Sequence, residues 1–144
     1  MQAYPHHYSV TASGKSTEHV HIHSPGLVSI ESAPPAQFGG PGDLWSPETF
    51  LVAAVADCFI LTFKAIARAS SFEWTALQCD VEGILDRVDK VSLFTEFRLK
   101  AELTVPHGTD ESKAVRLMEK AEHGCLITNS LKSTLSLQAK VLLE

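Results

Sequence analysis

Three cysteines are the residues of this 144-residue chain that could act as nucleophiles or exchange disulfides: Cys58, Cys79 and Cys125. A cysteine reacts as its thiolate, so the question for each thiol is what stabilises the anion. Cys125 precedes a short predicted helix at 126–131, whose free N–H groups favour an anion, whereas Asp57 beside Cys58 disfavours one. Packing alone also explains each sulfur, because free cysteine is among the most buried residue types.

Capping residues and hydrophobic periodicity predict the helices that position two of these thiols. Ser46 is a suitable N-cap and Pro47 a suitable first helical residue, which predicts a helix over 47–69 with Cys58 near its middle. This helix is apolar on nearly every side from 50 to 63, so we expect it to be a buried central helix. A second helix, with Thr109 or Asp110 as its N-cap, is predicted to run through Glu122, just before Cys125.

Alternating apolar and polar residues between turn residues predict the strands. They fall in the segments 6–13, 18–31, 75–85, 97–105 and 135–143. A Pro- and Gly-rich loop is predicted over 33–45, and loops of this length are often functional. The order of elements, strands then helix then hairpin then helix then strand, is typical of an α+β protein. Without a break in composition, we expect a single domain over residues 1–144.

Composition and charge exclude several classes of partner. The net charge is −5 and the sequence contains no run of Lys or Arg that could bind phosphates, so we expect no nucleic acid partner. The longest apolar run is interrupted by Asp57 and is shorter than the ~20 residues of a membrane span, so no membrane partner is expected. An odd number of cysteines without a secretory signal argues against a framework of structural disulfides. These features predict a cytoplasmic protein.

A histidine cluster offers a different interpretation. His19, His21 and His23 lie on one face of a predicted strand, and His-x-His spacing can hold two ligands of a zinc ion. A polar exposed strand face explains the same pattern without a metal. We therefore expect no metal site and no cofactor, and we keep a metal-binding histidine strand as an alternative.

Two segments together carry a more specific signal. "PGDLWSPETFLVAAVADCF" contains Cys58, and "AEHGCLITNSLK" contains Cys125, 67 positions further along. This pair closely resembles the OsmC/Ohr family of thiol peroxidases, in which a Pro-Glu pair opens a buried helix, an Ala-rich stretch leads to Cys-Phe, and a Gly-Cys segment precedes the last strand. The resemblance runs from about Phe38 to the C-terminus.

The resemblance implies a fold, a reaction and a partner. The fold is the α+β OsmC-like fold, with antiparallel sheets packed around a buried central helix, in an intertwined homodimer whose active sites lie at the interface. The reaction is the reduction of an organic hydroperoxide: Cys58 is the peroxidatic cysteine that becomes a sulfenic acid, and Cys125 is the resolving cysteine that condenses with it. An unidentified dithiol would return the disulfide to its reduced form. Such a protein serves the oxidative stress response as an antioxidant.

Glu48 matches the glutamate of the family motif, but ten residues of helix place it about 15 Å from Cys58 along one straight helix. If Glu48 serves the reaction, the cysteine it serves belongs to another subunit. Family members also place an arginine against the peroxidatic cysteine. This chain has no arginine before Arg68, and the corresponding regions offer Lys15 or Gln37. A thiol redox sensor or a binding protein on the same fold therefore remains the alternative to an enzyme.

Overall fold

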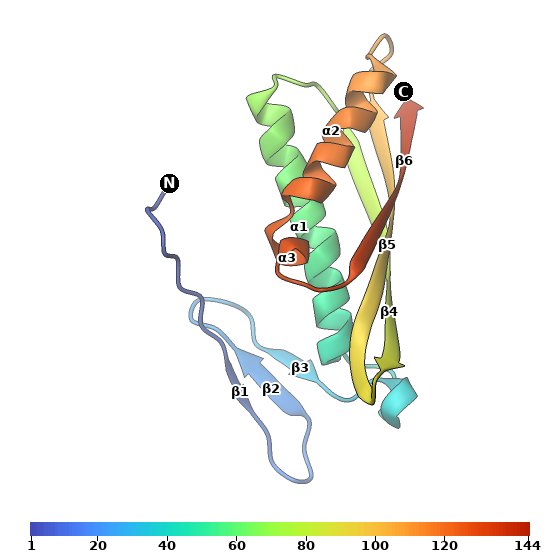
Figure 1. Ribbon diagram of the computed structural model, residues 1–144. Helices are drawn as coiled ribbons and strands as arrows, with labels where there is room; N and C mark the ends of the chain where they lie inside the picture. Colours follow the sequence, from blue (N-terminus) through green and yellow to red (C-terminus); the bar gives the residue numbers. More distant parts are fainter. The chain divides into compact units, whose positions relative to one another are not determined.

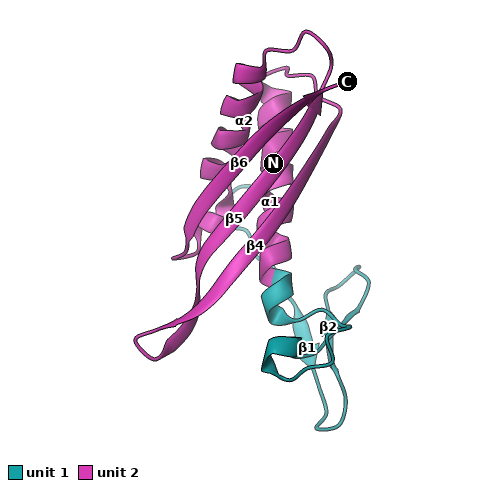
Figure 2. Ribbon diagram, turned by 90° about the vertical axis from the view of Figure 1, so that its right-hand side faces the viewer, with its two compact units in different colours: residues 1–50 teal, residues 51–144 magenta.

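The computed structural model describes residues 1–144, which form two compact units, residues 1–50 and residues 51–144 (Figure 2). We call them unit 1 and unit 2. The long helix α1 (Pro47–Ala69) begins in unit 1 and continues in unit 2. The prediction of one domain over the whole chain is not decided by this division and stays a prediction.

Unit 1 contains a small antiparallel sheet of three short strands, in the order β1-β2-β3. The strands are β1 (Thr11–Ser13), β2 (Val20–His23) and β3 (Ile30–Ser32). They occupy only parts of the segments 6–13 and 18–31 in which strands were expected. The Pro- and Gly-rich segment that follows is the predicted loop, with a single 3₁₀ turn, η1 (Ala36–Phe38).

The start of α1 is fixed by reciprocal hydrogen bonds between Ser46 and Thr49. The backbone N–H of Thr49 donates to Ser46 Oγ over 3.1 Å, and the backbone N–H of Ser46 donates to Thr49 Oγ1 over 2.8 Å. Two of the N–H groups that a helix start leaves free are therefore satisfied. The prediction of a helix over 47–69 is confirmed at both ends.

Unit 2 is a three-stranded sheet with helices on one face (Figure 1). Its elements after α1 are β4 (Ala76–Val88), β5 (Val91–Val105), α2 (Glu111–Gly124), α3 (Leu126–Asn129) and β6 (Thr134–Leu143). α1 and α2 cover the same face, and the opposite face is free of helices (Figure 2). β4 and β5 form an antiparallel hairpin, but β6 runs parallel to β5. The expectation of purely antiparallel sheets is wrong for this pair, because α2 and α3 carry the chain back before β6 begins.

Only one face of α1 is buried within the chain. Val55, Phe59, Phe63 and Ala67, spaced by four residues, pack against the sheet. The helix lies close to β4 where Gly83 has no side chain, since a Cβ there would lie 2.8 Å from Val52 Cγ2. Most other faces are half-buried or exposed, and Leu61 is 55% exposed. The expectation of a helix buried on all sides therefore does not hold within one chain.

By length and composition alone, α1 could also cross a membrane. The length of the uninterrupted apolar run did not predict this, because that run ends at the charged residue Asp57. The core helix of a soluble protein meets the same criterion, so this is weak evidence for a membrane.

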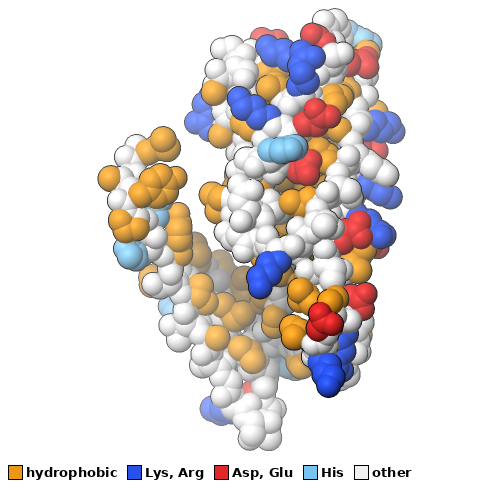
Figure 3. Space-filling model, in the orientation of Figure 1, with side chains coloured by type: hydrophobic (Ala, Val, Ile, Leu, Met, Phe, Trp, Pro, Cys, Tyr) orange, Lys and Arg blue, Asp and Glu red, His pale blue; other side chains and the backbone are white.

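Exposed apolar side chains concentrate in unit 1, as the orange side chains along the N-terminal segment and strands indicate (Figure 3). The large ones are Met1, Tyr4, Tyr8, Val10, Val20, Leu27, Val28, Ile30, Phe38 and Trp45. Exposed apolar side chains in this number within one small unit favour an interaction surface there.

Candidate active site

Cys58 and Cys125 come together in unit 2 although they are far apart in the sequence. Cys58 lies half-buried in the middle of α1, and its Sγ is 3.8 Å from Thr62 Oγ1, one turn further along the helix. Cys125 is 1% exposed and stands between α2 and α3, as the C-cap of one and the N-cap of the other. Hydrogen bonding between the Cys58 and Cys125 side chains lowers the pKa of Cys58 and raises that of Cys125.

The surroundings of Cys58 favour its anion. Burial acts to raise the pKa of this thiol, but hydrogen bonds to the sulfur outweigh burial, so the pKa of Cys58 is lowered. The donors, in decreasing order of effect, are the Cys125 thiol, the backbone of Ile127, the Thr62 hydroxyl and the backbone of Leu126. The neighbouring Asp57 carboxylate is not among the groups that shift this pKa. Neutral dipoles alone therefore favour the thiolate here, because no cation contributes.

Cys125 is shifted in the opposite direction. Burial raises its pKa, and hydrogen bonds with Thr128 only partly offset the effect. Donation to Cys58 and the negative charge of a Cys58 thiolate raise it further. The expectation that the short helix after Cys125 would favour an anion on Cys125 itself is wrong. The backbone of Leu126 and Ile127 at the start of α3 interacts with Cys58 instead.

Cys79 stands apart from this pair. It lies on β4 and packs against the hydrophobic core, as the alternation of its strand predicted. Burial, the Asp80 carboxylate and Cys125 together raise the pKa of Cys79 to about 12. A thiol with such a pKa stays protonated at neutral pH and is a poor nucleophile.

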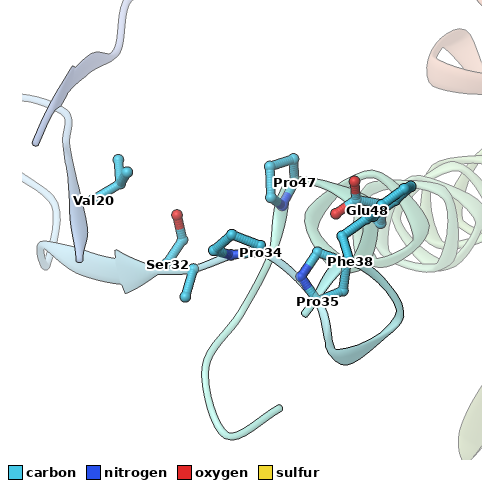
Figure 4. Close-up of a pocket in the computed structure, with 8 residues that line it drawn as sticks. Val20, Ser32, Pro34, Pro35, Phe38, Pro47 and Glu48 are labelled. Carbon is cyan, nitrogen blue, oxygen red and sulfur yellow. The ribbon is translucent and has the colours of Figure 1, made fainter. Parts of the chain in front are cut away.

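Glu48 lies in unit 1, on the first turn of α1, and one of its carboxylate oxygens lacks a partner. Oε2 is buried and accepts no hydrogen bond. The side chain borders a cavity of ≈ 300 Å³ whose other walls come from β2, β3 and the loop before α1 (Figure 4). The other lining residues are Val20, Ser32, Ala33, Pro34, Pro35, Phe38 and Pro47. A buried carboxylate in a largely apolar cavity is costly unless a donor reaches it.

The two residues proposed in place of the family arginine do not pair with Glu48 Oε2. Lys15 lies in the turn between β1 and β2, where its ammonium forms an exposed ion pair of 3.2 Å with Glu18. Gln37 is an exposed residue of η1 and is not among those that line the cavity. Within the chain, no group donates a hydrogen bond to Glu48 Oε2.

The three histidines of the candidate metal strand do not form a site. His21 Nδ1 lies 3.7 Å from Glu31 Oε1 on the neighbouring strand, and His23 Nδ1 lies 3.5 Å from the Ser29 hydroxyl. His19 precedes β2 and is exposed. No group of three or more His, Cys, Asp or Glu side chains in the structure has the arrangement of a metal site. Cross-strand polar contacts on an exposed sheet face account for two of these residues.

Comparison with known proteins identifies the family. The family model described as OsmC-like protein matches residues 40–140, which include both cysteines of the pair. The chain belongs to the OsmC-like protein family. This confirms the resemblance that the two cysteine segments indicated.

Two bacterial proteins, an uncharacterized protein and a peroxiredoxin, are similar to this chain in sequence. The uncharacterized protein YmaD of Bacillus subtilis (strain 168) is 28% identical over 138 residues, which cover 92% of this chain and 91% of YmaD. Peroxiredoxin OsmC of Escherichia coli (strain K12) is 32% identical over 92 residues, which cover 64% of each protein.

Solved structures of the OsmC-like family share the fold. An OsmC-like protein of unknown function from Vibrio cholerae superimposes with a TM-score of 0.84 at 18% identity, over 94% of this chain and 99% of that one. An organic hydroperoxide resistance protein from Elizabethkingia anophelis gives 0.78 at 19% identity, over 99% and 100%. The prediction of an α+β OsmC-like fold is therefore confirmed, and these low identities establish the fold alone.

The apolar side chains near Cys58 in this OsmC-like protein differ in their access to solvent. Phe59, the next residue along the helix, is 0% exposed and belongs to the hydrophobic core, so it does not border an approach to the thiol. Leu61 and Leu126 are the exposed apolar side chains next to the reactive elements, and Leu126 is 67% exposed. Sequence reasoning missed these leucines and Thr62. A helical wheel centred on Cys58 would have found Leu61 and Thr62, at three and four residues' distance.

Proposed function

We propose that this OsmC-like protein is a thiol peroxidase that reduces organic hydroperoxides through Cys58 and Cys125. The observation that carries the proposal is the hydrogen-bonded pair with opposite pKa shifts, lowered at Cys58 and raised at Cys125. A two-cysteine peroxidase needs this asymmetry, because the attacking sulfur must be a thiolate while its partner stays reduced and close. The names of relatives, peroxiredoxin OsmC and organic hydroperoxide resistance protein, support the same reaction class.

The reaction begins at the Cys58 sulfur. The thiolate attacks the terminal oxygen of ROOH, the O–O bond breaks, and the alkoxide leaves and takes up a proton as ROH. Cys58 is then a sulfenic acid, oxidised by two electrons. The Cys125 sulfur attacks that sulfenic sulfur, water leaves, and the Cys58–Cys125 disulfide forms. An external dithiol reduces the disulfide and regenerates both thiols.

The surroundings of Cys58 favour organic over inorganic peroxides. The exposed side chains of Leu61 and Leu126 offer apolar contacts to the alkyl group of a substrate, which hydrogen peroxide lacks. Burial of each CH₂ group contributes about 0.8 kcal/mol, so a bulky alkyl chain adds substantially to binding. We therefore propose alkyl or fatty-acid hydroperoxides as the substrate class.

Consumption of cumene hydroperoxide in the presence of excess dithiothreitol tests this proposal. The wild-type protein is expected to turn over many times, and Cys58→Ser to be inactive. Cys79→Ser is the matched control, since it removes a thiol of the same chain that lies outside the pair, and it is expected to keep the activity. A wild-type protein that consumes a single equivalent and stops would contradict the enzyme and favour the thiol redox sensor.

A further inference from the structure

Thr62 lies beside both halves of the cysteine site. Its hydroxyl lies 3.8 Å from the Cys58 sulfur. Its methyl group lies near the end of α2, since a Cβ added to Gly124 would be in van der Waals contact with Thr62 Cγ2, at 3.5 Å. Gly124 immediately precedes Cys125. One side chain therefore spans from the reactive thiol to the backbone that carries the resolving thiol.

The hydrogen bonding of Thr62 is unusual for a threonine inside a helix. Such a hydroxyl commonly bonds to the carbonyl four residues earlier, as Ser130 does with Leu126 O in this protein. The Thr62 hydroxyl makes no such bond, and its hydrogen-bond partner is the Cys58 sulfur. The hydroxyl and the methyl group of this side chain thus point to different neighbours, the Cys58 sulfur and the end of α2.

We propose that Thr62 is a positioning residue that couples the two cysteines. Its hydroxyl holds the Cys58 sulfur ready as an anion, and its methyl group keeps the junction of α2 and α3 at the distance from which Cys125 reaches that sulfur. This inference rests on the proposed two-cysteine chemistry. No cation is among the groups that shift the pKa of Cys58, and the hydrogen bond with Thr62 acts to lower that pKa.

Two substitutions separate the two contacts. Thr62→Val keeps the branched shape and the methyl contact and removes the hydroxyl, whereas Thr62→Ser keeps the hydroxyl and removes the methyl. Thr95→Val is the control, because Thr95 is a half-buried threonine whose hydroxyl bonds to a backbone carbonyl of the sheet instead. All variants are made in the full chain with Cys79→Ser, so that only the paired thiols remain.

Two measurements that need no peroxide distinguish the effects of these substitutions. Iodoacetamide alkylation of Cys58, followed by peptide mass spectrometry from pH 5 to 10, gives the fraction of thiolate. Equilibration with oxidised dithiothreitol gives the ease of forming the Cys58–Cys125 disulfide. Thr62→Val is expected to move the alkylation profile to higher pH and slow alkylation several-fold near neutral pH. Thr62→Ser is expected to keep that profile and to weaken disulfide formation several-fold.

The inference is overturned if Thr62→Val has the alkylation profile of the control, or if Thr62→Ser forms the disulfide as readily as the control. If Thr62→Val does not fold by circular dichroism, the Thr62→Ser result decides. Loss of peroxidase activity plays no part in either readout. A failed proposal for Thr62 is therefore distinguishable from a failed proposal for the enzyme.

Discussion

The almost fully buried side chain of Cys125 interacts with the half-buried side chain of Cys58, and this hydrogen bonding lowers the pKa of Cys58 while it raises that of Cys125. Of the two thiols, Cys58 is therefore the one that forms a thiolate more readily. The sulfur of Cys125 lies close to where a sulfenic acid on Cys58 would form.

The backbone of Leu126 is expected to contribute to the reactivity of Cys58. Leu126 is the first residue of α3, where proline is well tolerated, and Cys125 before it has the extended conformation (φ −68°, ψ 110°) that a proline requires. Leu126→Pro removes the N–H that bonds to the sulfur, so we expect alkylation of Cys58 at neutral pH to slow several-fold. Leu126→Ala keeps that N–H and is expected to preserve the alkylation profile. Equal profiles for the two variants would contradict a role for this backbone group.

The buried thiol of Cys79 is expected to make the folded protein less stable at alkaline pH. The pKa of Cys79 is raised to about 12 from an ordinary value of 9.0, so the folded state keeps its proton while the unfolded state releases it. The contribution of Cys79 to stability is therefore full below pH 9 and is lost as the pH rises toward 12. Urea unfolding at pH 8 and pH 10.5 measures this loss, and Cys79→Ala, which has no thiol to titrate, should lose less stability between them. An equal loss in both proteins would refute the buried thiol as its cause.

Glu48 is expected to serve a cysteine of a second subunit in a homodimer. The buried Oε2 without a donor, the half-exposed faces of α1 and the exposed apolar residues of unit 1 motivate this expectation. Glu48→Gln and Cys58→Ser should each lower the peroxidase activity by more than tenfold. Coexpression of the two variants should restore activity to about a quarter of the wild-type level. About half of the dimers are then mixed, and each mixed dimer has one intact site of two.

The folding stability of the Glu48→Gln variant is the control for the dimer prediction. Glu48→Gln loses a helix N-terminal charge worth about 0.3 to 1 kcal/mol and also removes a buried carboxylate oxygen without a partner, so we expect the variant to stay folded. An activity loss with unchanged stability therefore reports on the site. Absence of recovery on coexpression, or a folded monomer in sedimentation at micromolar concentration, would contradict a site shared between subunits.

Local sequence patterns predicted much of the fold. The limits of α1 follow from Ser46, Pro47 and a continuous helical segment, and the alternation in β5 and β6 identified both strands. The parallel pairing of β5 with β6 could not be predicted in this way, because pairing depends on where α2 and α3 return the chain. The burial of α1 was overestimated for a related reason. Apolar composition shows which residues avoid water and does not show which chain covers them.

Sequence segments singled out the two cysteines, but they did not indicate the hydrogen bonding around them. Cys58 and Cys125 were both identified from sequence segments, and they lie together in the structure. Sequence proximity assigned the N–H groups of α3 to Cys125, whereas tertiary packing directs Leu126 and Ile127 toward Cys58. The bonding of Thr62 to sulfur and the buried oxygen of Glu48 likewise depend on contacts between elements. Such contacts leave no periodic signal in the sequence.

Mass spectrometry of the protein after one equivalent of cumene hydroperoxide tests whether Cys58 and Cys125 react as a peroxidatic and resolving pair. We predict an intramolecular Cys58–Cys125 disulfide, with Cys79 left reduced because its thiol stays protonated. We also predict a trappable sulfenic acid on Cys58 in the Cys125→Ser variant, since no second thiol then condenses with it. If Cys58 remains reduced in folded protein under excess peroxide, the two-cysteine peroxidase is contradicted.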